Sequence, residues 1–201
     1  MRTRFFKLAI AGACLLLVAG AAACGDGEEE APIPTPVFLT PLPPQAMPTV
    51  DASVPLVEYR SPDGGFSVSH PDGWTDLRNM SGPDFAVFSW TEDGIPIAQL
   101  TVLCNRGENQ TVDSLIAGDA AISAQFSGGS TSDPVPIEVA GTSGKQVTYA
   151  RNVSGLTVEQ VAAFVVTGDC GWRIGLDTYV KGSLQSYLPL FERILASFQA
   201  G

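Results

Sequence analysis

Residues 158–167 restrict the possible folds more than any other part of the chain. Alternate side chains of an extended strand point to opposite faces of a sheet. Both sets are apolar here: Val161, Ala163 and Val165 on one face, and Ala162, Phe164 and Val166 on the other. A strand of this kind lies in the middle of a sheet that is covered on both sides. The sequence therefore predicts a layered fold around a central sheet.

Shorter patterns predict the neighbouring elements. Strands are expected where apolar residues alternate with polar ones or lie between turn signals: over residues 66–69, 85–90, 97–104, 135–139, 144–151 and 172–177. A first helix is expected over residues 111–126, with Thr111 as its cap and Gly128-Gly129 after its end. Leu115, Ile122 and Phe126 would form its buried side.

A second helix is expected at the C-terminal end, where apolar residues between Leu184 and Phe198 have amphipathic spacing. A proline inside a helix costs about 3 kcal/mol, so the regular helix is expected to begin near Pro189. The order of strands, helix, strands and helix, with hairpin-like links, predicts an α+β fold. Its sheet would be mostly antiparallel, with one helix on each face.

The first 57 residues have a different character. Residues 1–23 carry three bases and no acid, and they contain no charge from Leu8 to Ala23. This pattern predicts a secretory signal peptide, and the apolar stretch is shorter than the roughly 20 residues of a spanning helix. Ala21-Ala22-Ala23-Cys24-Gly25 resembles a bacterial lipobox, although Ala21 stands where Leu is usual. We expect lipidation of Cys24; ordinary cleavage that leaves a terminal thiol is the alternative.

Residues 24–57 are expected to form a tether. They begin with a run of acids, and eight of the chain's 15 prolines fall between Pro32 and Pro55. Proline disfavours both central strands and helix interiors, so an extended spacer is expected. Binding of this stretch by a partner is the alternative. Residues 58–201 would then form a single domain.

The charge of the chain limits its partners. Removal of the signal would leave 8 bases and 21 acids, a net charge of −13. This argues against a nucleic-acid binder, which needs a basic surface. The acidic surface can serve solubility, which we favour, or it can recruit a basic partner or cations.

Cys104 and Cys170 remain after processing. In an exported domain a disulfide between them is favoured, and two separate buried thiols are the alternative. Two cysteines without histidine partners do not supply the four ligands of a structural zinc site. No metal or other cofactor is therefore predicted.

His70 is the single histidine, with Asp72 and Asp76 nearby in the sequence. A histidine that replaces a packed aromatic is favoured over a general base, and a weak metal contact with Asp72 is a smaller alternative. Carboxylates alone can hydrolyse glycosides, so a hydrolase stays open as the weakest hypothesis. The prediction is that the protein is not an enzyme.

Five aromatic residues could line a ligand pocket, but in a domain of this size they are more often part of the core. They are Trp74, Phe85, Phe88, Trp90 and Trp172.

Three motifs carry a family resemblance: Gly65-Phe66-Ser67-Val68 followed by His70-Pro71-Asp72-Gly73-Trp74, the strand Gly171-Trp172-Arg173-Ile174, and the closing stretch from Leu190 to Phe198. Residues 58–199 resemble PsbP-like domains, with His70 where the family usually has tyrosine. The resemblance implies an α-β-α sandwich around an antiparallel sheet and a non-enzymatic accessory role. Family members include lumenal photosystem II proteins and bacterial lipoproteins.

Together these features predict an extracytoplasmic lipoprotein that is anchored to the cell membrane. It would act as an accessory or interaction module for an unknown envelope protein. The alternative is a carrier of a small molecule or lipid, with a pocket between sheet and helix.

Overall fold

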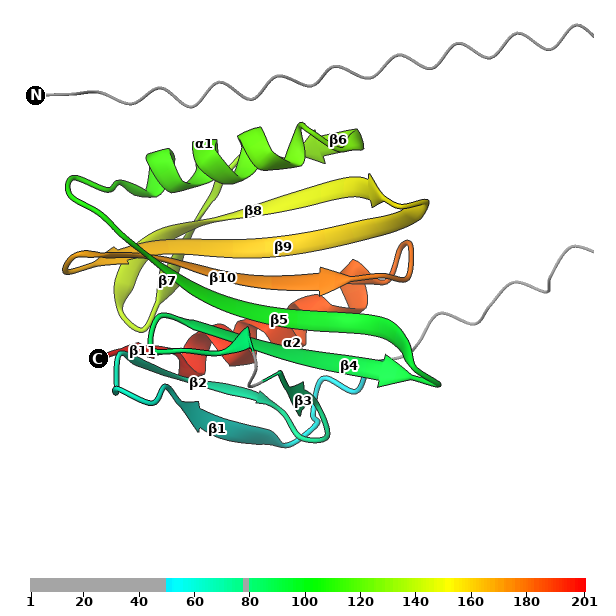
Figure 1. Ribbon diagram of the computed structural model, residues 1–201, viewed down its shortest axis with the longest axis horizontal. Helices are drawn as coiled ribbons and strands as arrows, with labels where there is room; N and C mark the ends of the chain where they lie inside the picture. The colour runs from blue at the N-terminus through cyan, green and yellow to red at the C-terminus, as the bar shows by residue number, and fades with distance from the viewer. Residues whose placement is uncertain (1–49, 78–79) are drawn as a thin grey trace, which may run out of the picture. The chain divides into compact units, whose positions relative to one another are not determined.

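The computed structural model describes residues 50–77 and 80–201 (Figure 1). Its elements, in chain order, are β1 (Leu56–Arg60), β2 (Phe66–Pro71), β3 (Thr75–Asp76), β4 (Phe85–Glu92), β5 (Ile95–Arg106), α1 (Val112–Ser123), β6 (Ser127–Thr131), β7 (Val135–Val139), β8 (Thr142–Val153), β9 (Leu156–Thr167), β10 (Cys170–Thr178), α2 (Leu184–Ser197) and β11 (Gln199–Ala200).

The strands form two antiparallel sheets. The larger sheet has the order β3-β4-β5-β10-β9-β8-β6, with β7 also paired to β8. The smaller sheet has the order β1-β2-β11. The predicted central strand is β9, which lies between β8 and β10.

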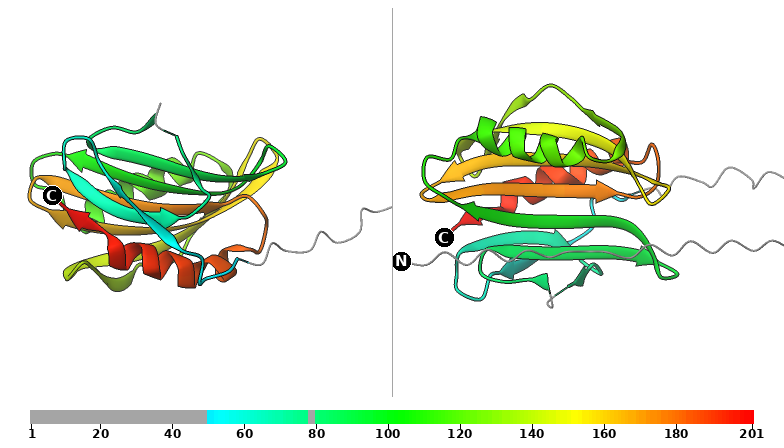
Figure 2. Two further views of the ribbon diagram at one scale, coloured as in Figure 1. Left: turned by 90° about the horizontal axis from the view of Figure 1, so that it is seen from below. Right: turned by 45° about the horizontal axis from the view of Figure 1, so that its top comes forward.

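Both faces of β9 are covered, as the sequence predicted. Val161, Ala163 and Val165 belong to the main core, which the larger sheet forms with β2 and α2. Ala162 and Phe164 belong to a second cluster, which includes Ile116 of α1. Figure 2 shows α2 running along one side of the strands. The observed architecture confirms the predicted α+β sandwich with a mostly antiparallel sheet.

The helix α1 begins as predicted but buries different residues. Thr111 is its N-cap, and its hydroxyl accepts a hydrogen bond from the backbone N–H of Ser114. The helix ends at Ser123, and the residues that follow form β6, which the sequence did not predict. Ile122 is 57% exposed, so its predicted burial is wrong; Ile116 packs on the sheet instead.

The helix α2 begins five residues before Pro189, so the predicted start near that proline is wrong. Leu184 and Tyr187 are buried against the main core, and this packing stabilises the turn that precedes the proline. The carboxylate of Glu159 also accepts hydrogen bonds from the backbone N–H groups of Gly182 and Leu184, at 3.0 and 3.5 Å. A side chain from β9 thus supplies the cap that Ser183 does not.

The fold includes residues 50–57, which we had expected to belong to the tether. Val50 and Val54 pack against the main core. The guanidinium of Arg193 donates hydrogen bonds to the carbonyls of Ala52 and Val54, the latter at 3.0 Å. The predicted signal peptide, the lipidation site at Cys24 and the rest of the tether lie outside the described residues. Within the described part of the chain, no helix has the length and hydropathy needed to cross a membrane.

Candidate functional site

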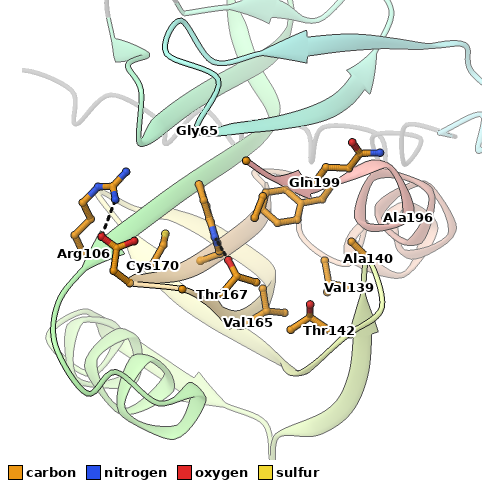
Figure 3. Close-up of a pocket in the computed structure, with 16 residues that line it drawn as sticks. Gly65, Arg106, Val139, Ala140, Thr142, Val165, Thr167, Cys170, Ala196 and Gln199 are labelled. Carbon is orange, nitrogen blue, oxygen red and sulfur yellow. Dashed lines mark hydrogen bonds and ion pairs between the residues drawn. The ribbon is translucent and has the colours of Figure 1, made fainter.

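A hollow of about 770 Å³ lies at one end of the larger sheet. It is lined by parts of residues 139–142, 165–172 and 196–201, together with Gly65 and Arg106. These segments come from the β7–β8 turn, the β9–β10 hairpin, the end of α2 and the strand β11 (Figure 3). We call this feature the disulfide-end hollow.

A disulfide between Cys104 and Cys170 joins β5 to β10 beside the hollow, with the two Cα atoms 5.5 Å apart. The structure thus has the pairing that the sequence favoured. Cys170 also lines the hollow, so the disulfide fixes one wall of it.

Arg106 forms two ion pairs at the edge of the hollow. Its guanidinium donates to the carboxylate of Asp84 at 2.7 and 2.9 Å and to that of Asp169 at 3.0 Å. The bond from Arg106 lowers the pKa of Asp84, and the two carboxylates raise the pKa of Arg106. Arg106 and Asp84 are therefore charged at neutral pH. Both ion pairs of Arg106 are exposed, so solvent screens them.

The inner wall of the hollow is apolar. Val139, Val165 and Phe198 are buried there. The indole Nε1–H of Trp172 donates to the hydroxyl of Thr167 at 2.8 Å, as the dashed line in Figure 3 shows. The tryptophan's polar group is thus satisfied within the domain, and its ring contributes to the main core.

The strand β11 adds backbone groups to the hollow. Gln199 pairs with Ser67 of β2, and the N–H of Gly201 donates to the carbonyl of Gly65 at 2.9 Å. Ala200 lies between these two positions. In an antiparallel pair, residues alternate between facing the partner strand and facing away. The N–H and C=O of Ala200 therefore point away from β2, along the free edge of the small sheet.

The hollow offers charged, hydroxyl and backbone groups to a ligand. Its ionisable side chains are Arg106 and Asp169, which are paired with each other, and its cysteine is oxidised. Thr142 and Thr167 add hydroxyls to the lining, and the hydroxyl of Thr167 accepts the indole N–H of Trp172.

His70 lies away from this hollow, on β2. Its ring stacks on that of Phe88, with centroids 4.2 Å apart, and its Nδ1 lies 3.0 Å from the carbonyl oxygen of Pro71. Burial lowers the pKa of His70, although the Pro71 carbonyl and the charges of Asp76 and Asp72 oppose this shift. The structure places His70 among packed aromatics, as the sequence favoured.

The two acids near His70 have local partners. A carboxylate oxygen of Asp72 accepts the N–H of Gly73 at 2.9 Å, and a carboxylate oxygen of Asp76 accepts the hydroxyl of Ser81 at 3.2 Å. Across residues 50–77 and 80–201, no three or more His, Cys, Asp or Glu side chains are grouped to hold a metal ion.

The sequence did not indicate a buried polar group on the face of the larger sheet that α1 covers. Asp177 on β10 is 9% exposed and accepts a hydrogen bond from the side chain of Gln160. Arg173, on the same face, pairs with Asp119 of α1 at 2.9 Å. Burial raises the pKa of Asp177, against the opposing charges of Arg173 and Arg151 and the Gln160 bond. The alternation of β10 places Asp177 on this face, but only the folded structure shows that its side chain is buried.

Large side chains of α2 fill most of its interface with the larger sheet. Tyr187, Phe191 and Ile194 of α2 are almost completely buried against the main core. The disulfide-end hollow lies at the end of this interface and is open to solvent, whereas a carrier encloses most of its ligand.

Comparisons with known proteins show the fold. No family model matches the sequence, and no curated protein matches it. The solution structure of cyanobacterial PsbP (CyanoP) from Synechocystis matches with a TM-score of 0.54 and 16% identity, over 73% of this chain and 92% of that one.

Two further structures match at similar levels. The Saccharomyces cerevisiae Ran-binding protein Mog1p has a TM-score of 0.53 and 12% identity, over 74% of this chain and 96% of that one. A crystal structure from Bacteroides thetaiotaomicron has a TM-score of 0.50 and 13% identity, over 72% of this chain. The match covers 48% of that longer chain, so this protein spans about half of its length. From the antiparallel sheet, the two helices on opposite faces and these matches, we conclude that the described domain has the fold seen in cyanobacterial PsbP and in Mog1p.

Proposed function

We propose that this protein is a lipid-anchored, extracytoplasmic interaction module without catalytic activity, and that it binds a segment of an envelope protein in the disulfide-end hollow. The observation that carries the proposal is the hollow itself, which offers binding groups from several distant segments.

The shape and chemistry of the hollow suit a peptide segment. An open site of this size accommodates several residues of a partner, while its apolar wall can receive a side chain. The free backbone edge at Ala200 can pair with an extended segment, which is how strand addition gives affinity. The fold is also compatible with this role, because Mog1p is a Ran-binding protein.

The rest of the described domain supports a non-enzymatic role. The single histidine is packed on Phe88, and Asp72 and Asp76 make hydrogen bonds with neighbouring residues. A general base must instead reach a substrate proton.

The anchor is tested separately from the binding site. Cys24→Ala should move the full-length protein from the membrane fraction to the soluble fraction of its own host. Mass spectrometry of the wild type should show acyl mass on a chain that starts at Cys24. An unmodified chain, or membrane association that survives Cys24→Ala, contradicts the anchor.

The binding site is tested by site-specific photo-crosslinking in the host envelope. A photoreactive residue at Thr142 or Gln199, which line the hollow, should give one discrete crosslinked protein. The same residue at Ile95, which is 63% exposed and outside the hollow, is the matched control. Ala196→Arg, which places a long cationic side chain at the hollow, should abolish the crosslink.

The outcomes distinguish the hypotheses. A crosslink that is equally strong at Ile95, or absent at both hollow positions, contradicts the proposed site. A small apolar compound that copurifies and is displaced by Ala196→Arg would favour the carrier instead.

A further inference from the structure

A second, smaller groove lies away from the disulfide-end hollow. It has a volume of about 340 Å³, and Trp74 and Trp90 line it together with the core residue Leu190. Val50 and Val54 complete its apolar lining, and Asp51 and Asp72 supply carboxylates. We call it the tryptophan groove.

The two tryptophans are held by different elements. Trp74 follows β2, and its backbone N–H donates to the carbonyl of Pro71 at 3.2 Å. Trp90 lies on β4, just before an irregularity in its pairing with β5, and its ring is 6.5 Å from that of Tyr187. Both are half-buried, whereas Trp172 is 2% exposed. Trp172 is therefore part of the core, whereas Trp74 and Trp90 lie at a surface groove.

The carboxylates give the groove a negative potential. Asp51 accepts hydrogen bonds from the backbone N–H and the hydroxyl of Ser53, which lower its pKa. One oxygen of Asp72 accepts the N–H of Gly73. The charge of Arg193 acts on Asp51, but this guanidinium donates to the carbonyls of Ala52 and Val54 and does not line the groove.

We propose that the tryptophan groove binds an organic ammonium group. Tryptophan faces attract cations more strongly than other aromatic rings, and paired aromatic walls recognise quaternary ammonium ligands. The two carboxylates add the complementary charge, and the apolar lining excludes strongly hydrated metal ions. The volume is at the lower end of the range for ligand pockets, which suits a small headgroup. This site does not depend on the proposed protein-binding hollow.

The chain's tryptophans supply the readout. It has three tryptophans, so a spectrum of the ¹⁵N-labelled full-length protein should contain three indole Nε1–H signals. Titration with choline should shift the Trp74 and Trp90 signals and leave the Trp172 signal in place. Trp90 pairs with Ala98, whereas Trp172 pairs with Cys104, so Trp172 lies toward the other end of β5.

The neutral isostere of choline, 3,3-dimethylbutan-1-ol, tests whether charge matters. Choline should bind at least about five-fold more tightly than this alcohol, in line with cation–π energies in partly desolvated sites. Equal binding of the two compounds would show that the positive charge does not contribute to affinity, and it would overturn the proposal. Absence of any shift at Trp74 and Trp90 would overturn it as well.

Two variants test the named residues. Asp72→Asn keeps the acceptor for Gly73 but removes the charge, and it should weaken choline binding about three-fold. Asp133→Asn makes the same change in net charge in the exposed loop between β6 and β7, and it should leave binding unchanged. Trp74→Leu should abolish binding, while an unchanged Trp172 signal in the free protein shows that the domain still folds. If Asp133→Asn weakens binding as much as Asp72→Asn, the groove is not the site.

A last experiment distinguishes a free ammonium compound from a lipid headgroup. Flotation with phosphatidylcholine vesicles, compared with phosphatidylglycerol vesicles, shows whether Cys24→Ala protein binds the headgroup within a lipid. Binding to free choline alone identifies a soluble cation, and binding to both identifies a headgroup; each result supports an ammonium site.

Discussion

The imidazole of His70 lies almost parallel to the phenyl ring of Phe88, with 15° between the two planes. The ring therefore occupies the place of a packed aromatic side chain while it keeps the ability to bind a proton. Because burial lowers the pKa of His70, the neutral form prevails in the folded state at neutral pH.

This arrangement predicts a pH dependence of stability. An unfolded histidine titrates near pH 6.5, so below that pH the unfolded chain binds more protons than the folded one. The contribution of His70 to the free energy of unfolding should therefore be complete above pH 6.5. It should fall as the pH decreases toward the lower folded-state pKa.

The matching variant is His70→Phe. Urea unfolding of wild type and variant between pH 7.5 and 5 should give curves that separate on acidification, with the wild type losing more stability. Curves that stay parallel over this range would show that the pKa of His70 is not lowered in the folded state.

Asp177→Asn should stabilise the domain at neutral pH. Burial raises the pKa of Asp177, so the folded state holds its proton more tightly than the unfolded chain. The wild type therefore loses stability as the pH rises from about 4 through the folded-state pKa. Asparagine keeps an acceptor for Gln160, so the variant's advantage should grow across this window and be absent below it. Lower stability of the variant at pH 7 would mean that the attraction of Arg173 and Arg151 outweighs the burial.

Removal of the disulfide should destabilise the domain strongly. Cys104 and Cys170 are 66 residues apart in the sequence, and a chain-entropy treatment of such a loop gives about 4 kcal/mol. The double variant Cys104→Ser/Cys170→Ser should show this loss in chemical denaturation without a reductant. Wild type with dithiothreitol is the control, and a reduced wild type as stable as the oxidised protein would contradict the prediction.

Gly144→Ala and Gly118→Ala should have opposite effects on stability. A Cβ at Gly144 would lie 2.4 Å from the carbonyl oxygen of Phe164 on the paired strand β9. We expect a loss of about 1–3 kcal/mol from this overpacking. A Cβ at Gly118 in α1 meets nothing within 4 Å, so alanine there should add about 0.5–1 kcal/mol through helix propensity. Thermal unfolding of both variants measures these effects as changes in the midpoint temperature. Equal changes in the two variants would contradict the prediction.

The sequence predicted those elements of the fold whose residues form a continuous local pattern. β9 was visible because both of its faces are apolar, and α1 was visible because Thr111 and the residues after it form a cap. The strand β6 was not predicted, since its sequence SGGST contains no apolar residue and all five residues are exposed. It pairs with β8 through its backbone, which leaves no side-chain signal.

Two errors arose where tertiary packing outweighs local preference. Pro189 disfavours a helix interior, yet Leu184 and Tyr187 are buried on the turns before it, and Glu159 caps the helix from another strand. Ile122 has suitable spacing for burial, but α1 rests on the sheet through Ile116. Both outcomes depend on contacts with residues that are distant in the sequence.

The candidate sites were harder to predict than the fold. The disulfide-end hollow combines Gly65, Arg106 and three later segments that only the sheet order brings together. The tryptophan groove was partly visible, because Trp74 and Trp90 were among the aromatics weighed as core or pocket. Their half-buried state depends on how Val50, Val54 and Leu190 pack beside them.

The double role of β9 has a consequence for how the domain denatures. Loss of the α1 side would leave Ala162 and Phe164 in water, and loss of the α2 side would do the same to Val161, Ala163 and Val165. If either layer separates from the sheet, apolar residues of β9 become exposed to water, which is unfavourable. The two layers are therefore coupled through a single strand, and the domain should denature as one cooperative unit in a single all-or-none transition.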